Sequence, residues 1–232
     1  MIFRSTIFYT ILCFWTILLG LICIPYLLFP AKNLNNPIRF WISGIFLFLK
    51  YICLITFEIQ GVKNIPNKAV IVASKHQSAF ETFALYYHLP KATFIHKKQL
   101  FLIPIFGQYL KKIRMISIDR KGGASTMRLM LKEAKLKIKS GYSIIIFPEG
   151  TRKRIGEAPS YKTGLIGLYK ELKTEILPVA LNSGKFWPKQ MFIKKSGHII
   201  IKFLPLISAD LERKKIMSEV EEKIEEATRK II

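Results

Sequence analysis

Hydrophobic positions are unevenly distributed along the chain and are densest at its N-terminal end. Residues 5–30 contain no charged side chain. A helix of about 25 residues is about 37 Å long, which exceeds the roughly 30 Å hydrocarbon core of a bilayer. A secretory signal peptide is disfavoured, because the run is longer than the usual apolar core and ends in Leu-Leu-Phe-Pro without a small-residue cleavage site. The pattern therefore predicts a membrane helix.

A second apolar stretch covers residues 38–59 and is interrupted by Arg39, Lys50 and Glu58. It predicts a helix from Pro37 to about Cys53 that lies on the membrane or dips into it, followed by a first strand with the sequence ITFEIQG. A single span and a helical hairpin both fit this pattern. We expect residues 1–55 to form membrane-anchoring helices and residues 56–232 to form an α/β domain.

Beyond Gly61, short apolar runs alternate with segments of helical periodicity. The predicted strands cover residues 69–74, 92–96, 113–118, 143–147, 175–181 and 198–204. One predicted helix covers residues 79–88 and is stopped near Pro90, and a second covers residues 124–140. A C-terminal amphipathic helix carries apolar side chains on one face: Ile216, Val220, Ile224, Ala227 and Ile231. The alternation predicts an α/β fold with a mostly parallel sheet flanked by helices, preceded by an N-terminal apolar helix or helical pair.

Charge adds a preference for anionic partners. The 232 residues carry a formal net charge of +22, and half of them are hydrophobic. Apolar excess combined with basicity favours a membrane surface, and therefore membrane lipids, over nucleic acid. Arg4 alone precedes the first apolar segment, whereas Lys32, Arg39 and Lys50 follow it, so the positive-inside bias predicts a cytoplasmic α/β domain. The abundance of Lys, Ile and Asn hints at a bacterial source, and hence at the inner (plasma) membrane.

A histidine and a glutamate follow the strand predicted at residues 69–74. His76 lies at the strand's C-terminal end, where α/β enzymes gather their chemistry. Ser78 and Glu81 fit a helix capping box, with serine at the N-cap and glutamate three residues later. Glu81 would also lie close enough to accept a proton from the imidazole of His76 and to raise the basicity of the other ring nitrogen. The cap and the catalytic interpretation are both open.

Two further motifs follow strands and carry cationic side chains. Arg120 ends the strand predicted at 113–118; its guanidinium suits phosphate, although a surface ion pair with Asp119 is the ordinary interpretation. The sequence Phe-Pro-Glu-Gly-Thr-Arg, residues 147–152, directly follows a very apolar strand, where Gly150 allows a tight turn. A fourth motif, Leu-Pro-Val-Ala-Leu-Asn at residues 177–182, places Pro178 inside a strand pattern, which predicts an edge strand or a bulge.

In this order, the four motifs resemble the lysophosphatidic acid acyltransferase family of glycerolipid acyltransferases, over roughly residues 59–184. The family's histidine–four residues–acid motif is met by His76 and Glu81, and the stretch Lys97–Leu100 resembles its segment before the arginine motif. The chain departs from the family in having Glu81 where Asp is more usual and Lys75 where Asn is frequent.

The resemblance implies that residues 56–232 are an acyltransferase domain that makes phosphatidic acid from lysophosphatidic acid, with acyl-CoA or acyl carrier protein supplying the acyl group. It implies His76 as general base, Glu81 as its orienting partner, and no cofactor beyond the thioester co-substrate. The substrate-binding residues that it implies are Lys98, Arg120, Glu149, Gly150, Thr151 and Arg152. We expect no metal site, because the histidines and the cysteines Cys13, Cys23 and Cys53 show no ligand spacing.

Three alternatives remain at this stage. The acceptor could be glycerol 3-phosphate or another lysophospholipid. A serine hydrolase using Ser74 or Ser78 is disfavoured, because neither serine lies in a Gly-x-Ser-x-Gly elbow. A non-catalytic membrane anchor that binds polyanions would explain the charge but not the motifs.

Overall fold

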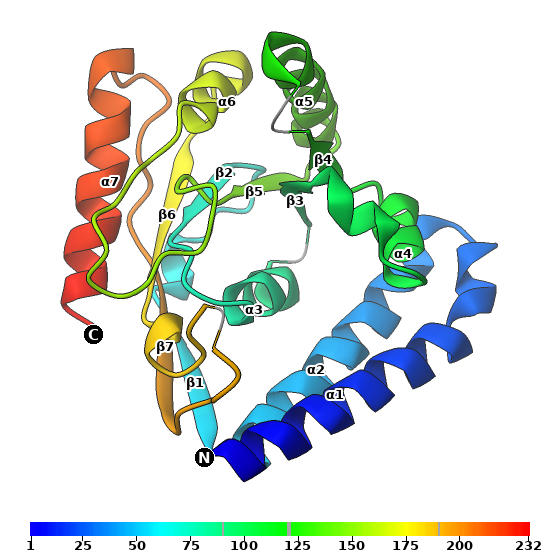
Figure 1. Ribbon diagram of the computed structural model, residues 1–232. Coiled ribbons are helices and arrows are strands. Elements are labelled where there is room, and N and C mark those ends of the chain that lie inside the picture. Colours follow the sequence, from blue (N-terminus) through cyan, green and yellow to red (C-terminus); the bar gives the residue numbers. More distant parts are fainter. Residues whose placement is uncertain (90, 120–121, 190) are drawn as a thin grey trace.

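The computed structural model of the chain describes residues 1–89, 91–119, 122–189 and 191–232. Within these ranges, seven strands form one sheet in the order β1-β7-β6-β2-β5-β3-β4 (Figure 1). The strands are β1 (Ile55–Gln60), β2 (Ile71–Ser74), β3 (Ala92–Lys97), β4 (Ile116–Ile118), β5 (Ser143–Ile146), β6 (Ile176–Leu181) and β7 (Gly197–Phe203).

The sheet is mixed but mostly parallel, as the sequence predicts. Neighbouring strands from β6 through β2, β5 and β3 to β4 are parallel. Strand β7 runs antiparallel to β6 and carries β1 alongside it in parallel. The carboxyl ends of β2, β3, β4, β5 and β6 therefore meet at one edge of the sheet, which is where an α/β fold places its site.

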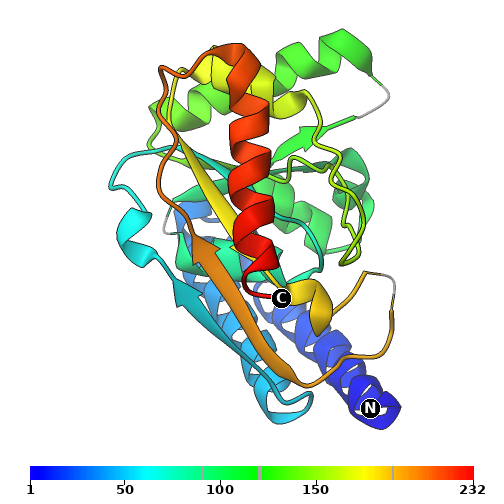
Figure 2. The ribbon, with the colours of Figure 1, turned by 90° about the vertical axis from the view of Figure 1, so that its left-hand side faces the viewer.

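Helices cover both faces of the sheet (Figures 1 and 2). Helix α3 (Phe80–His88) packs on one face with the N-terminal helices, and α5 (Gly123–Lys139), α6 (Gly164–Leu172) and α7 (Arg213–Arg229) pack on the other. Helix α7 is the predicted amphipathic C-terminal helix, and its Ile216, Val220 and Ile224 side chains are fully buried against the sheet. Both apolar faces of a parallel sheet are thereby covered.

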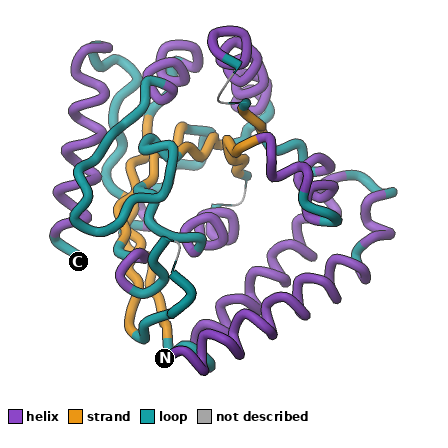
Figure 3. The backbone as a smooth tube through the Cα atoms, in the orientation of Figure 1, coloured by secondary structure: helices purple, strands orange, loops and turns teal. Residues whose placement is uncertain are grey.

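The N-terminal apolar region forms a helical hairpin. Helices α1 (Ile2–Ile22) and α2 (Asn35–Tyr51) lie side by side, joined by the short 3-10 turns η1 (Ile24–Leu27) and η2 (Ala31–Leu34) (Figures 1 and 3). The indole of Trp15 donates to the carbonyl of Trp41 at 3.1 Å, and the indole of Trp41 donates to the hydroxyl of Thr16 at 3.0 Å. These two hydrogen bonds hold the pair together.

Helix α1 is shorter than the charge-free stretch. It ends at Ile22 rather than near Pro30, because Pro25 has no N–H to continue the helix and disfavours helical backbone at the residue before it. Within its 21 residues, an 18-residue window has a mean hydropathy of 2.0, and the helix is long and apolar enough to cross a membrane. Apolar side chains on the hairpin remain exposed, including Phe14, Ile17, Leu21, Ile22, Phe29, Phe40 and Leu47. Contiguous exposed apolar surface of this kind marks an interaction site.

Two predicted strands differ from the observed ones in an informative way. Strand β4 covers only Ile116–Ile118, because Arg114 adopts a left-handed backbone with φ of 54° and breaks the extended run. The predicted edge position of Pro178 is wrong, since β6 lies between β7 and β2. An irregularity in the pairing lies opposite Pro178 and not in β6 itself. Val179 pairs with Phe203 and Ile176 bridges Ile207, so the extra residue belongs to the segment that follows β7.

The remaining short helices lie in the loops: η3 (Val62–Asn64), η4 (Lys98–Leu102), α4 (Phe106–Lys112) and η5 (Ser183–Lys185). Pro90, the expected stop of the helix now seen as α3, lies outside the described residues.

Candidate active site

Three adjacent strands bring the site together. Strand β2 lies between β5 and β6, and the chain leaves all three at the same edge of the sheet. His76 follows β2, Glu149 follows β5 and Ser183 follows β6. The topology thus places three motifs that are far apart in sequence within one crevice.

The predicted contact between His76 and Glu81 is present. Nδ1 of His76 lies 2.9 Å from Oε1 of Glu81. Because an ionised carboxylate only accepts hydrogen bonds, Nδ1 carries the proton in the neutral ring and Nε2 is free to act as a base. The ring of His76 stacks on Phe147, with centroids 3.8 Å apart and planes at 14°, which fixes its orientation.

Glu81 also caps helix α3, so the two interpretations of the motif hold together. Its Oε1 accepts hydrogen bonds from the backbone N–H groups of Gln77 and Ser78, both at 2.7 Å. Its Oε2 accepts from the hydroxyls of Ser78 at 2.9 Å and Ser183 at 2.8 Å. The helix begins at Phe80, two residues later than Ser78, whose hydroxyl accepts the Phe80 N–H instead of the Glu81 N–H.

These donors decide the ionisation of Glu81. Burial by itself raises the pKa of this fully buried carboxyl, but the hydrogen bond and charge of His76 and the hydrogen bonds from Ser78 and Ser183 outweigh it. The net pKa is lowered from 4.5. Glu81 is therefore ionised at neutral pH and able to stabilise an imidazolium at His76.

Glu149 takes part in a second buried network behind the histidine. Its Oε1 lies 3.1 Å from Nζ of Lys75 and accepts the backbone N–H of His76 at 3.3 Å. The same ammonium group lies 2.7 Å from Oε1 of Glu225 on α7, which also accepts from the hydroxyl of Tyr161 at 3.1 Å. Burial raises the pKa of Glu149 against the opposing effect of Lys75. The network ties the His76 loop to the C-terminal helix.

A large apolar cavity opens in front of His76. Its volume is about 1440 Å³, and its walls come from α1, α2, α3, α4, α5 and the ends of β3 and β5. Helices α1 and α2 contribute Ile17, Leu19, Ile38, Trp41 and Ile42, so the hairpin forms part of the cavity wall. The size and lining suit a ligand with a long apolar portion.

Basic and polar side chains line this cavity together with His76. The lining includes Lys97, Arg152, Lys162 and Lys189 together with Thr151 and Thr163. Gly150 lies there too, with φ of 67°, and its N–H closes a tight turn onto the carbonyl of Phe147 at 2.8 Å. Glycine reaches this backbone conformation without strain, which brings the chain back past the histidine.

The structure therefore gathers most, but not all, of the predicted substrate-binding residues. Glu149, Gly150, Thr151 and Arg152 line the cavity with His76. Lys98 is exposed at the start of η4 and is not among the residues that line it, whereas its neighbour Lys97 is. Arg120 lies outside the described residues. The substrate-binding roles of all six residues stay predictions.

Sequence reasoning missed several groups that hold the histidine. Ser183 donates to Glu81 from the end of the neighbouring strand β6, and Phe147 stacks on His76. The sequence marks Lys75 only as a departure from the family pattern and gives no signal for Glu225. A serine directly after the fourth motif was the one available signal for Ser183. Among the described residues, no cluster of three or more His, Cys, Asp or Glu could hold a metal ion, and the expectation of metal-free chemistry stays a prediction.

An oriented histidine in the wall of a large apolar cavity is the geometry of an enzyme that uses general-base chemistry on a lipid-like substrate. The chain belongs to the Acyltransferase family, whose model matches residues 56–182. This membership confirms the resemblance read from the motifs and makes acyl transfer the class of reaction.

Individual relatives agree with this membership. The 1-acyl-sn-glycerol-3-phosphate acyltransferase of Pseudomonas aeruginosa is 29% identical over 225 residues, which cover 96% of this chain and 87% of the relative. The protein of the same name from Borreliella burgdorferi is 28% identical over 194 residues, covering 81% and 73%. The fold is similar to the crystal structure of the 1-acyl-sn-glycerophosphate acyltransferase PlsC from Thermotoga maritima, with a TM-score of 0.81 at 22% identity and coverage of 99% and 95%.

Proposed function

We propose that this acyltransferase moves a fatty acyl group from a thioester to the sn-2 hydroxyl of lysophosphatidic acid and forms phosphatidic acid. The observation that carries the proposal is the His76–Glu81 pair, with Nδ1 and Oε1 2.9 Å apart, at the cationic end of a cavity of about 1440 Å³. The names of the relatives in Pseudomonas and Borreliella support the same acceptor.

The reaction needs one base and no enzyme nucleophile. Nε2 of His76 takes the proton of the acceptor hydroxyl as its oxygen attacks the thioester carbonyl. The tetrahedral intermediate then collapses, the carbon–sulfur bond breaks, and the thiolate leaves and is protonated by the imidazolium. Glu81 holds the ring and stabilises its positive charge through Nδ1. General-base catalysis of this kind contributes roughly 10²–10⁴-fold to a rate.

The cavity favours an acceptor that already carries an acyl chain. Its apolar wall would take the chain of lysophosphatidic acid, while Arg152, Lys162 and the predicted Arg120 would attract the phosphate. Glycerol 3-phosphate has no apolar portion to fill such a space, so it is the weaker candidate.

The exposed hairpin supports a location at a membrane. One helix, Ile2–Ile22, is apolar enough to span, and both α1 and α2 line the cavity and expose apolar side chains. An acylated acceptor could pass from the lipid phase into the cavity along these helices. The net charge of +22 would hold the domain against anionic lipid. We place the enzyme in a bacterial inner membrane with its catalytic domain towards the cytoplasm, and with acyl-CoA or acyl carrier protein as its only co-substrate.

The test is an acceptor and donor comparison in membranes that contain the wild-type protein. Palmitoyl-CoA and palmitoyl-acyl carrier protein are each supplied with lysophosphatidic acid, glycerol 3-phosphate or lysophosphatidylcholine, and labelled products are separated. Phosphatidic acid as the main product, in excess over membranes without the protein, is expected. Preferential acylation of glycerol 3-phosphate or lysophosphatidylcholine would move the enzyme to that acceptor and contradict the proposal.

A further inference from the structure

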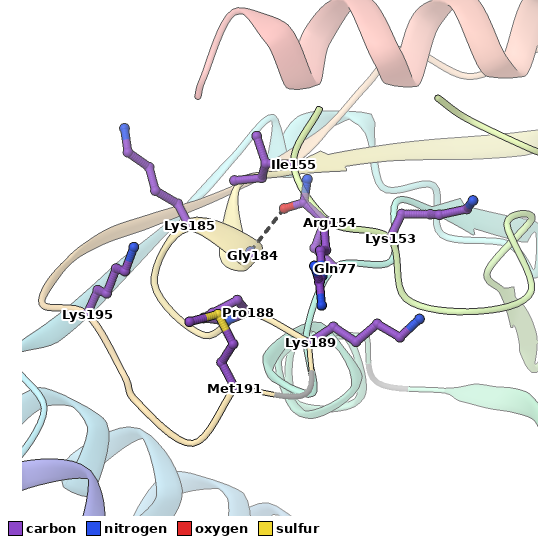
Figure 4. A pocket seen from close by; sticks show the side chains of 10 residues that line it. All are labelled: Gln77, Lys153, Arg154, Ile155, Gly184, Lys185, Pro188, Lys189, Met191 and Lys195. Atoms are coloured by element: carbon purple, nitrogen blue, oxygen red, sulfur yellow. Dashed lines mark hydrogen bonds between the residues drawn. The ribbon is translucent and has the colours of Figure 1, made fainter. Parts of the chain in front are cut away.

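A second, smaller pocket adjoins the His76 loop at Gln77. Its volume is about 280 Å³, and it is lined by residues that follow β2, β5 and β6 (Figure 4). We propose that this pocket binds the phosphate of the acyl donor, meaning the phosphorylated end of a phosphopantetheine thioester. The inference rests on the proposed function, because it assigns the second substrate of that reaction.

The pocket is rigidly connected to the catalytic loop. Gln77 directly follows His76, is buried, and accepts the N–H of Gly184 through its side-chain oxygen at 3.0 Å (Figure 4). Gly184 has to be small here, because a Cβ on it would lie 2.9 Å from Cβ of Gln77. On the β5 side, the N–H of Lys153 donates to the carbonyl of His76 at 2.8 Å. A ligand in the pocket would therefore be held in a fixed position relative to the base.

The pocket's lining is strongly cationic. Its residues include Lys153, Arg154, Lys185, Lys189 and Lys195 and no carboxylate. Figure 4 shows Lys185 and Lys195 on one side of the Gln77–Gly184 hydrogen bond and Lys153 and Lys189 on the other.

Few of these charges are neutralised within the described parts of the chain. Lys153 lies 3.8 Å from a half-exposed Glu157, and Lys185 donates to the carbonyl of Ile232 at 2.6 Å. No ion pair involves Arg154, Lys189 or Lys195 among the described residues. Like charges gathered at a concave surface attract an anion of high charge density, and phosphate fits that description.

The position of the pocket points to the donor rather than the acceptor. The large apolar cavity includes residues of β3, β4 and β5, whereas six of the ten residues that line the small pocket follow β6. His76 lines the large cavity, and its neighbour Gln77 lines the small pocket. Lys189 lines both, so the two spaces adjoin. A transfer between two phosphorylated substrates needs two anion sites, one on each side of the base. The apolar side chains of Ile155, Pro188 and Met191 would contact the uncharged pantetheine arm.

The experiment changes the charge of this pocket alone. The double variant Arg154→Gln, Lys195→Gln removes two exposed cations that line only the small pocket. The control is Lys170→Gln, Lys214→Gln, which removes two exposed cations that line neither space. KM is measured for lysophosphatidic acid and for three donors: palmitoyl-CoA, palmitoyl-dephospho-CoA and palmitoyl-acyl carrier protein.

The pocket variant is expected to raise the donor KM about tenfold or more, because each lost contact is a charge-assisted hydrogen bond. In the pocket variant, the KM for lysophosphatidic acid is expected to change less than about twofold. In the control variant, the KM values for lysophosphatidic acid and for all three donors are expected to change less than about twofold. A rise with all three donors assigns the pocket to the phosphate next to pantetheine, which all three share. A rise with palmitoyl-CoA alone would place the 3′-phosphate there instead and would contradict the assignment. Unchanged donor KM for every donor, a rise for lysophosphatidic acid instead, or the same rise in the control would each overturn the inference.

A binding measurement separates this inference from the proposed function. Coenzyme A and holo-acyl carrier protein, without acceptor, are titrated into the wild type and both variants. If the wild type makes no phosphatidic acid, the proposed function fails, yet weaker binding in the pocket variant alone would still support the pocket. If the wild type makes phosphatidic acid but its binding matches that of the pocket variant, the pocket assignment fails by itself.

Discussion

Glu81 and Glu149 are both buried beside His76, yet their surroundings move their pKa values in opposite directions. Glu81 meets the imidazole, two backbone N–H groups and two serine hydroxyls, and its pKa is lowered. Glu149 shares one ammonium group, that of Lys75, with Glu225, and burial raises its pKa. The number of donors around each carboxylate, rather than its depth, therefore decides the direction in which its pKa moves.

The comparison assigns the two carboxylates different tasks. Glu81 is equipped to stay ionised and to stabilise a positive charge on the ring of His76. Glu149 contacts the backbone of His76 and, through Lys75, the C-terminal helix, so it holds the loop in place. The family resemblance implies a substrate-binding role for Glu149. The contacts with His76 and Lys75 add a structural role to that prediction.

The largest expected effect comes from removing the Glu81 carboxylate. Glu81→Ala is expected to lower kcat by roughly 10²–10⁴-fold, because the imidazole loses both its orientation and its counter-charge. Glu81→Asp keeps the charge and is expected to retain substantial activity. Steady-state assays of both variants at equal amounts of folded protein check this. Similar, near-normal activity in both would reduce Glu81 to a helix cap.

Substitutions in the network of Lys75, Glu149 and Glu225 are expected to change the free energy of unfolding more than kcat. Lys75→Met would leave the buried carboxylates of Glu149 and Glu225 without their shared cation, which destabilises by about 3–5 kcal/mol. Glu149→Gln leaves the Lys75–Glu225 pair in place and is expected to destabilise by less. Denaturant unfolding in detergent measures both free energies. Equal losses of unfolding free energy in the two variants would show that Lys75 stabilises the fold through Glu149 alone and that its ion pair with Glu225 on α7 contributes nothing.

Ser183 offers a smaller change on the Glu81 side. Ser183→Ala removes one of the donors to Oε2 and leaves the contact with His76 in place. A loss of about 1–2 kcal/mol in unfolding free energy and a several-fold fall in kcat are expected. A loss as large as that of Glu81→Ala would mean that Ser183 does more than orient the carboxylate.

The smallest expected effect concerns the pH dependence of stability, to which Glu81 and Glu149 contribute with opposite signs. The lowered pKa of Glu81 makes its contribution to stability complete above pH 4.5, and that contribution is lost as the pH falls through the lowered value. The raised pKa of Glu149 has the opposite sign, because the folded state then binds more protons, so stability falls as the pH rises through 4.5 towards the raised value.

Unfolding free energies between pH 7 and pH 3 test these slopes. As the pH falls, the advantage of the wild type over Glu81→Gln is expected to shrink, while its stability relative to Glu149→Gln is expected to improve. Neither glutamine titrates, so each difference reports one carboxyl group. Parallel trends for the two variants would show that the contrast between the carboxylates is absent.

Local sequence patterns sufficed for much of the fold and for the centre of the site. Apolar runs followed by His76 and by residues 147–152 place both motifs at strand ends, and the parallel sheet brings those ends together. The five-residue spacing from His76 to Glu81 spans only a tight loop and the first turn of α3, so it could be read without tertiary information.

Contacts between distant segments could not be predicted in this way. Ser183 reaches Glu81 only because β6 lies beside β2, and Glu225 reaches Lys75 only because α7 crosses the sheet at that point. The sequence pattern fits both a single span and a helical hairpin, because an uncharged stretch does not show where its helix ends. In the structure, Pro25 ends the first helix. Pro178 was read as an edge or a bulge because the pattern of a single strand carries no information about its neighbours.

The most direct test of the central claim is acyl transfer by His76→Ala, compared with the wild type in the same vesicles. The account predicts that phosphatidic acid formation from lysophosphatidic acid and palmitoyl-CoA falls by roughly 10²–10⁴-fold, while membrane association and coenzyme A binding are retained. Retained activity in folded His76→Ala protein would contradict the account, because His76 is the residue to which the account assigns the base.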